Sequence, residues 1–355
     1  MNYKEAKEKA ILLVLGGSHA YGMATKDSDE DERGIVIGPI ESYLGLSNFE
    51  QAEDKVNDGV IYELKKFCKL ALDANPNIWD LFWSEEVRHI TKAGEILKDN
   101  RDLFLSRKAR FSFAGYAFSQ LKRIKTHRGY LIGNHPKFAP DPLDFGIDPT
   151  WKIGKDELYA INALADSMID AIEENIYRNA YSIGDDGRVT LNKETMREIV
   201  ISTIAEEKKE ETAAIFGLSK EIMTAYSRVK AYQAANRDWR KYQDWKKNRN
   251  PKRAVIENKF GYDTKHAMHL VRLLRMGREI LEDGVVNVKR PDAEELLAIR
   301  NGSWTYEQLE EFADREDLSF QTLYDKSPLP KTPNFKKVED LMMNIILDSF
   351  KLEKV

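Results

Sequence analysis

The chain has 355 residues, of which 42% are hydrophobic and 32% charged, and its formal net charge is −4. This length allows a sizeable core in two packed units, and the negative charge excludes a globally basic nucleic-acid coat. The single Cys68 excludes an internal disulfide framework and favours a reducing compartment. No apolar run reaches membrane-spanning length and the N-terminus is polar, so we expect a soluble, cytoplasmic protein without membrane contact.

The first predicted strand leads directly into a glycine turn. Five apolar residues, Ile11 to Leu15, run into Gly16-Gly17-Ser18, which predicts a buried strand that breaks sharply into a short helix. Glycine lets the backbone approach a ligand closely, and Ser18 could cap the helix, leaving its first amides directed at that ligand. We therefore expect Gly16, Gly17 and Ser18 to bind a phosphate.

A pair of acids precedes the second predicted strand. Asp29 and Asp31 are followed by Arg33 and by the apolar run Ile35 to Ile37. The two-residue period of a strand would place both carboxylates on one face, where a divalent cation such as Mg²⁺ or Mn²⁺ would relieve their repulsion. The alternative is a plain turn followed by a solvated acidic loop. The ordered combination of strand, turn, helix, acids and strand favours a nucleotide-and-metal site.

The stretch GSHAYGMATKDSDEDERGI resembles the RNA-repair-associated, RlaP-like branch of the DNA polymerase beta superfamily of nucleotidyltransferases. This resemblance implies an N-terminal α/β (α+β) domain with a small mixed sheet, followed by a mostly α-helical domain. It also implies transfer of a nucleoside monophosphate from an NTP, with ATP expected, and a third acid on a neighbouring strand. Arg33 would assist electrostatically.

The next part of the chain contains two candidates for the third acid. Residues 40–58 suggest a connecting loop with short ordered pieces. A helical pattern follows from Val60, and Asn75-Pro76 stops it. The aromatic run Ile78 to Trp83 predicts a buried strand that contains Asp80. Because a buried carboxylate must be paired or bind metal, Asp80 is our choice, with a simple salt bridge as the alternative reading. Glu63 is the competing candidate.

The segment from Leu103 to Pro140 contains no Asp or Glu but eight Lys or Arg, interleaved with aromatic residues. It could line a channel for a triphosphate or a nucleic-acid backbone, or it could be a helix whose rings form core. The block Gln120 to Ile124 resembles the same family, which implies that Lys122 and Arg123 bind nucleotide. A loop is expected over residues 138–153, helices over 157–176 and 191–210, and a loop over 181–188.

A long helix is predicted from Ser219 to the neighbourhood of Pro251. Between Arg237 and Arg253 it carries eight Lys or Arg against two Asp, with Trp239, Tyr242 and Trp245 among them. These rings and charges could bind single-stranded RNA or DNA. Equally, the rings could pack inward from an exposed basic helix.

The last strong pattern spans Tyr262 to Arg300. His266, His269 and Arg272 recur every three residues beside an apolar helix face, and no further His or Cys follows to complete a zinc site. We expect a phosphate-facing stripe, and include Lys265 among the nucleotide-binding residues. The block resembles the same family, in which a helical C-terminal domain closes over the nucleotide. Gly284 should end this helix, residues 293–300 should form the next, and 338–350 a closing helix.

These expectations combine into one functional hypothesis. Residues 1–100 form a nucleotidyltransferase domain, residues 101–355 form a mostly helical substrate-binding domain, and the active site lies in the cleft between them. Two metal ions on Asp29, Asp31 and Asp80 would serve catalysis and pyrophosphate release. The two basic segments favour an RNA end as acceptor. A protein or small-molecule acceptor, and a non-catalytic nucleotide or RNA-binding protein, are the alternatives.

Overall fold

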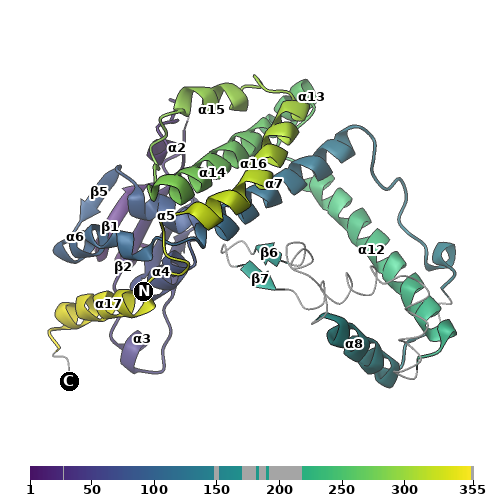
Figure 1. Ribbon diagram of the computed structural model, residues 1–355, viewed down its shortest axis with the longest axis horizontal. Helices are drawn as coiled ribbons and strands as arrows, with labels where there is room; N and C mark the ends of the chain where they lie inside the picture. The colour runs from purple at the N-terminus through teal and green to yellow at the C-terminus, as the bar shows by residue number, and fades with distance from the viewer. Residues whose placement is uncertain (27, 148–151, 170–180, 184–188, 192–217, 353–355) are drawn as a thin grey trace. The chain divides into compact units, whose positions relative to one another are not determined.

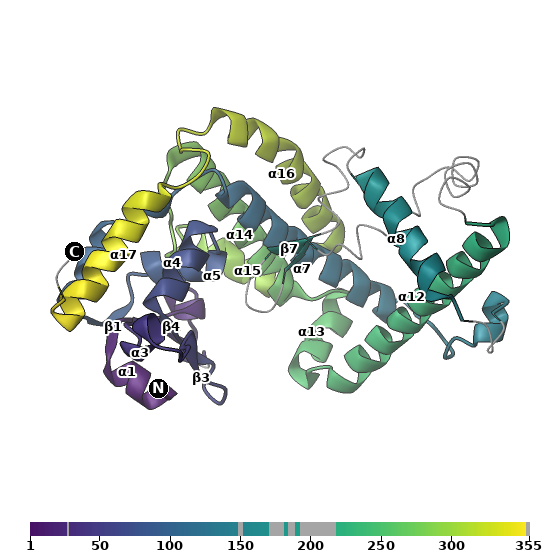
Figure 2. The ribbon, with the colours of Figure 1, turned by 90° about the horizontal axis from the view of Figure 1, so that it is seen from below.

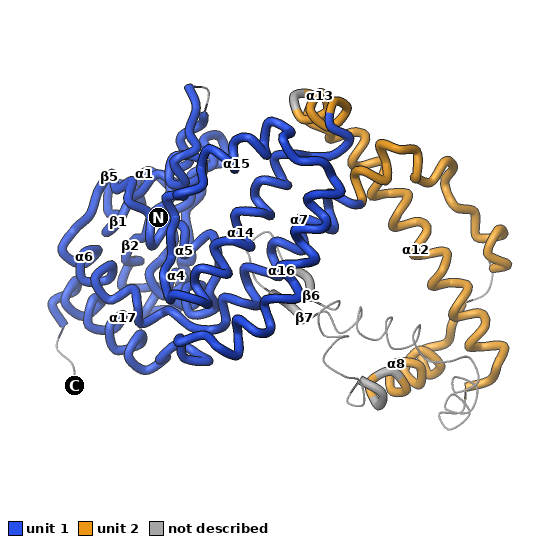
Figure 3. Tube along the Cα trace, turned by 45° about the horizontal axis from the view of Figure 1, so that its top comes forward, with its two compact units in different colours: residues 1–125, 260–355 blue, residues 126–259 orange. Residues whose placement is uncertain are grey.

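The computed structural model describes residues 1–26, 28–147, 152–169, 181–183, 189–191 and 218–352 (Figure 1). The chain divides into two compact units, one formed by residues 1–125 and 260–355 and the other by residues 126–259 (Figure 3). The first unit thus unites the two ends of the sequence, and the second is inserted between them. The boundary predicted near residue 100 concerns the family domain and stays a prediction.

A five-stranded mixed sheet in the order β3-β4-β2-β1-β5 forms the N-terminal part of the first unit. Its strands are β1 (Ala10–Leu15), β2 (Glu32–Val36), β3 (Gln51–Asp54), β4 (Gly59–Glu63) and β5 (Val87–Ile90). Strands β2 and β4 run parallel, whereas the other neighbouring pairs are antiparallel. All six residues of β1 are buried, as its unbroken apolar sequence predicts for a strand covered on both faces.

Short helices connect and cover these strands. They are α1 (Tyr3–Glu8), α2 (Gly17–Ala20), α3 (Glu41–Leu44), α4 (Leu64–Leu72), α5 (Pro76–Trp83), α6 (Lys92–Asp99) and the 3₁₀ turn η1 (Arg101–Phe104). The helix predicted from Val60 begins only at Leu64, because β4 occupies the preceding residues. Glu63 ends the strand and caps α4, its side chain accepting a hydrogen bond from the amide of Lys66 at 3.0 Å.

The strand predicted over Ile78 to Trp83 is wrong, since these residues belong to helix α5. Asn75 caps this helix by accepting hydrogen bonds from the amides of Asn77 and Ile78, and Pro76 occupies its first turn. The Asn-Pro pair therefore starts a helix as well as stopping one. Seven of the eight residues of α5 are buried, so the helix lacks the polar face by which a sequence pattern is recognised.

The helical part of the first unit is centred on α14 (Thr264–Asp283), which packs against α15 (Ala293–Arg300) and α16 (Tyr306–Lys326). At Gly277 a Cβ atom would lie 3.1 Å from both Phe113 and Phe320, so α14 closely approaches α7 (Ala109–Leu131) and α16 there. The last helix, α17 (Phe335–Phe350), packs on α4 and α6 (Figure 2). The predicted helix end at Gly284 and the helix over residues 293–300 are confirmed.

The second unit contains the end of α7 and a long helix. Its elements are η2 (Pro142–Phe145), α8 (Lys155–Ile169), β6 (Tyr181–Ile183), β7 (Val189–Leu191), α12 (Lys220–Asn248) and α13 (Pro251–Phe260), whose last residue belongs to the first unit. Ser219 caps α12, so the helix predicted from Ser219 is confirmed. The helix predicted over residues 191–210 lies outside the described residues except for Leu191, and the one over 157–176 is described only to residue 169.

The predicted fold class is confirmed: an N-terminal mixed sheet with helices is followed by a mostly helical chain. Within the described ranges, none of the helices is both long and apolar enough to cross a membrane.

Candidate active site

The glycine turn lies directly against Asp31. The amide of Gly16 donates a hydrogen bond to the backbone carbonyl of Asp31 at 2.7 Å. Gly17 has a φ of +56°, and a Cβ atom at this position would collide with the Asp31 carboxylate. The turn therefore needs glycine both for its backbone conformation and for the space that the carboxylate occupies.

Ser18 does not cap the short helix, contrary to the prediction. Gly16 is the N-cap of α2, without a side-chain hydrogen bond, and Ser18 lies inside the helix. Because α2 is a single turn, the amides of Gly17, Ser18 and His19 have no carbonyl of their own helix to bind. The turn thus presents successive backbone donors beside Asp31, which is the polarity that a phosphate requires.

The four consecutive acids from Asp29 to Glu32, which lead into β2, alternate between two groups. Glu30 forms an ion pair with Arg88 at 3.1 Å, and Glu32 forms one with Lys7 at 2.5 Å. The intervening Asp29 and Asp31 have no ion pair with any residue in the described ranges. The two-residue period predicted from the sequence therefore separates two surface ion pairs from two candidate metal ligands.

The pairing of β2 with β4 brings a third carboxylate, that of Asp58, near Asp31. In the parallel pair, Arg33 lies opposite Val60, so Asp31 and Asp58 occupy equivalent positions two residues earlier on their chains. Asp58 has a φ of 50°, which is unusual for a residue other than glycine. Asp58 was not predicted as a site residue, because it lies at the end of the segment that the sequence indicates as a connecting loop. The signal that could have revealed it is the apolar run Val60-Ile61 that follows directly, as Ile35-Val36 follows the first acids.

Burial and neighbouring charges shift the pKa of Asp31. Partial burial is the main cause that raises the pKa of this carboxyl above its ordinary value, and the charges of Asp58 and Asp29 raise it further. Arg33 and Lys265 act in the opposite direction and lower it. Three carboxylates and two cations therefore influence one another at this site.

The donor set fits a hard divalent cation. Mg²⁺ binds one or two carboxylates and takes its remaining ligands from water and substrate phosphates, so it does not need a complete protein cage. Asp29 and Asp31 supply such a pair. No set of three or more His, Cys, Asp or Glu side chains within the described ranges is already arranged around a metal position.

Asp80 has a different partner from the one that the sequence suggested. It is 4% exposed on α5, and both of its carboxylate oxygens lie near Arg272 Nη1, at 3.2 and 3.3 Å. Tyr21 Oη also donates a hydrogen bond to Asp80 at 2.5 Å. The structure therefore shows the salt bridge that was the alternative reading. The proposal that Asp80 binds metal loses its premise, since the buried charge is already compensated.

Glu63, the competing third acid, is also engaged. It accepts hydrogen bonds from the Tyr43 hydroxyl and from the amide of Lys66. It lies opposite Val36 in the strand pair, at the other end of β2 from Asp31. Its position favours a structural role.

The N-terminal end of α14 brings positive charge to the same unit. The charge of Lys265 lowers the pKa of Asp31. His266 Nδ1 lies 2.6 Å from Asp263 Oδ2. The pKa of His269 is held well below 6.5, mainly by desolvation and then by Arg272, Lys265 and other cations. His269 is therefore neutral at physiological pH. Arg272 is buried and forms an ion pair with Asp80, so it has a structural role and does not face a phosphate.

Several cations of the predicted basic channel have partners within the first unit. Arg107 donates to the carbonyls of Ser327 and Leu329, and Lys108 and Lys125 form ion pairs with Asp73 and Glu310. These cations therefore connect α7 and the two residues before it to other elements of the first unit. Lys122 and Arg123 are exposed on α7, and their role in nucleotide binding stays a prediction.

The mixed sheet, with a glycine-serine turn after one strand and paired acids before its neighbour, is the arrangement that the resemblance to the DNA polymerase beta superfamily of nucleotidyltransferases implies. Residues 2–130 match the family model described as "RlaP: RNA repair pathway DNA polymerase beta family". Over these residues the match confirms the resemblance found in the sequence.

A protein of Enterobacteria phage T4 is similar over most of its length. It is named "Uncharacterized 38.9 kDa protein in nrdC-mobD intergenic region", and it is 21% identical over 321 residues, covering 86% of this chain and 87% of the phage protein. No solved structure matches the chain.

Proposed function

We propose that the protein transfers a nucleoside monophosphate from an NTP to an acceptor hydroxyl and releases pyrophosphate. The observation that carries this proposal is the packing of the Asp31 carboxylate against Gly17, with Asp29 and Asp58 acting on the same group. A turn that offers backbone donors thus lies beside a concentration of carboxylates. The match of residues 2–130 to a polymerase-beta family supports the same reaction class.

The residues divide the work according to charge. The amides of Gly17 and Ser18 bind phosphate oxygens of the NTP, and Lys265 supplies positive charge from α14. His266 is held by Asp263 and can donate or accept at its other ring nitrogen. ATP is the expected NTP, and Lys122, Arg123 and His269 are further candidates for its binding.

Asp29 and Asp31 would hold Mg²⁺ or Mn²⁺, and Asp58 would join them on leaving Arg33. When bound there, the metal would neutralise the triphosphate and the leaving pyrophosphate. Arg33 pairs with Asp58 at 3.3 Å and so limits the repulsion among the acids. Arg33 can then serve the nucleotide only after leaving this partner.

The acceptor that we favour is an RNA end. The family description places its members in an RNA repair pathway, and both basic segments contribute to the second unit. A protein or a small molecule is the alternative acceptor.

The decisive experiment is incubation with each α-³²P-labelled NTP and Mg²⁺ against separate pools of RNA, protein and small molecules. We expect label in the RNA pool with wild-type protein and none with Asp31→Asn. Label in another pool would change the acceptor, and label in none, with intact NTP binding, would favour a nucleotide sensor. Equal transfer by Asp31→Asn would refute the assignment of the site.

A further inference from the structure

The long helix α12 gives the second unit a strongly positive surface. Residues 218–259 contain twelve Lys or Arg against four Asp or Glu, in a chain whose net charge is −4. Arg240, Lys241 and Lys247 are all exposed. Residues 240 and 247 are two turns apart and 241 adjoins 240, so these cations lie along one side of the helix. Such a row suits a ligand with regularly repeated negative charges.

Ring contacts join this helix to the other basic segment. The rings of His135 and Tyr242 stack with centroids 4.2 Å apart and an interplanar angle of 6°, and Tyr130 lies 5.2 Å from Trp245. His127 also contacts Trp245. The last part of the first basic segment, from His127 to His135, therefore packs against α12 within the second unit.

These contacts assign different tasks to the rings and to the cations. Tyr130, Tyr242 and Trp245 are half-buried against one another, so they hold the two helices in place rather than standing free for base stacking. Arg249 belongs to the same framework, because it lies 4.8 Å over Trp245 and pairs with the buried Glu257 at 2.8 Å. The groups that remain available for a ligand are the exposed cations of α12.

We infer that the exposed face of α12, defined by Arg240, Lys241 and Lys247, binds the phosphate backbone of single-stranded RNA. Recognition by cations alone predicts binding with little sequence preference and a steep salt dependence. The inference deepens the proposed function, on which it rests, by giving the RNA acceptor a binding surface on the second unit. On this face Asp238 lies 3.9 Å from Lys241 with both side chains exposed, a contact of little energetic weight.

The test compares two triple charge reversals by fluorescence anisotropy with a labelled, unstructured RNA, at several salt concentrations and without NTP or metal. The first variant is Arg240→Glu/Lys241→Glu/Lys247→Glu. The control is Lys65→Glu/Lys69→Glu/Lys337→Glu, which changes net charge equally at exposed positions of the first unit. Arg249 is left intact because reversing its charge would place two acids together at Glu257.

We expect the α12 variant to lose more than about tenfold in RNA affinity. The slope of log affinity against log salt should flatten by about 2, which corresponds to three lost phosphate contacts on a single strand. The control should bind like wild type. Neutral Gln substitutions at the three α12 positions should give an intermediate loss, and circular dichroism should show an unchanged fold for each variant.

Equal RNA binding by the α12 variant and the control would overturn the inference. So would competition by polyglutamate as effective as competition by unlabelled RNA, since the surface would then fit an acidic protein. Label transfer by the wild-type protein is measured separately, with a short RNA acceptor at saturating concentration. If the wild type bound RNA in a salt-dependent way but transferred no label, the proposed reaction would be rejected and the binding surface retained. If the wild type transferred label but the α12 variant bound RNA as well as wild type does, the surface would be rejected and the reaction retained.

Discussion

Arg272 and Asp80 form a buried ion pair that contacts Tyr21, the residue at the end of the glycine turn. The guanidinium of Arg272 lies 3.8 Å from the centroid of the Tyr21 ring, and the hydroxyl of Tyr21 donates to Asp80. Tyr21 directly follows α2, and its backbone carbonyl accepts a hydrogen bond from the amide of Arg290 at 3.1 Å. Helices α5 and α14 thereby fix the end of the turn that lies against Asp31.

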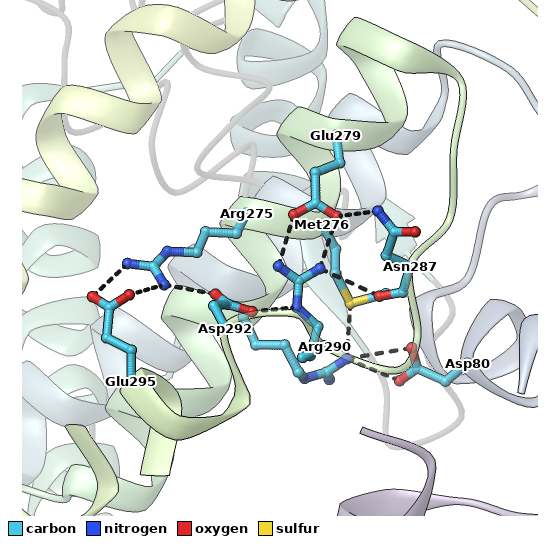
Figure 4. A network of polar contacts seen from close by, with 9 residues as sticks. Asp80, Arg275, Met276, Glu279, Asn287, Arg290, Asp292 and Glu295 are labelled. Atoms are coloured by element: carbon cyan, nitrogen blue, oxygen red, sulfur yellow. Dashed lines mark hydrogen bonds and ion pairs between the residues drawn. The ribbon is translucent and has the colours of Figure 1, made fainter. Parts of the chain in front are cut away.

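A second network keeps Arg290 in place. Its guanidinium donates to both carboxylate oxygens of Glu279, at 2.7 and 2.8 Å, and to Asp292 at 2.8 Å (Figure 4). Asp292 also accepts from Arg275, which pairs with Glu295. Figure 4 shows these side chains joined continuously between α14 and the start of α15. The segment after α14 is thus held firmly where it meets Tyr21.

Asp80→Ala should reduce the free energy of unfolding by about 3–5 kcal/mol, because it leaves the Arg272 charge buried and uncompensated. Urea unfolding measures this loss. The double variant Asp80→Leu/Arg272→Met should regain most of it, since an apolar pair removes the unpaired charge. An Asp80→Ala protein of unchanged stability with lost Mn²⁺ binding would instead restore Asp80 as a metal ligand.

Asp31→Asn should abolish transfer and stabilise the protein without metal at neutral pH. The pKa of Asp31 is raised in the folded state, so its ionisation costs stability as the pH rises through that folded value. The gain from the Asn substitution should therefore be present at pH 7 and vanish below the ordinary carboxyl pKa of 3.8. Thermal unfolding from pH 3 to 8 measures it. A loss of stability at pH 7 would contradict this account of the acid cluster.

Gly17→Ala should abolish NTP binding, because the added Cβ displaces Asp31 in addition to straining a φ of +56°. Gly22→Ala is the matched control. It has a φ of +71°, but its Cβ would meet only Lys289 Cγ at an ordinary 3.6 Å. The control should therefore lose only about 1 kcal/mol of stability and keep its NTP affinity. Titration calorimetry with a non-hydrolysable NTP compares the two, and equal affinities would refute the close packing of turn and acid.

The sequence revealed those parts of the site that are local in the chain. Gly17 and Asp31 were predictable together because the strand, turn and acid pair follow one another within about twenty residues. Asp58 was not, because its place beside Asp31 depends on the parallel pairing of β2 and β4, which no period along one strand encodes. The partner of Asp80 was equally hidden, since Arg272 lies 192 residues later in the chain.

The predictions failed where burial removed the usual pattern. Helix α5 is apolar almost all round, so neither the helical nor the strand period distinguishes it, and the aromatic content then favoured a strand. In α12 the three-residue spacing of Trp239, Tyr242 and Trp245 correctly placed them on one helix face. It could not show whether that face was free, because the rings that contact it come from the end of α7 and the residues after it.

Arg33→Gln should tighten Mn²⁺ binding in the absence of nucleotide and weaken NTP binding. Arg33 bonds to the carbonyl of Asp58 and pairs with its carboxylate, so metal must compete with this cation for Asp58. Stability should change by less than about 1 kcal/mol, because the Asp58 side chain is 78% exposed and exposed pairs contribute little. Electron paramagnetic resonance of free Mn²⁺ measures the metal affinity. The same substitution made together with Asp58→Asn should give no tightening, because the contested ligand is gone. If Arg33→Gln alone left Mn²⁺ affinity unchanged, Asp58 would not be a metal ligand, and the site would rest on Asp29 and Asp31.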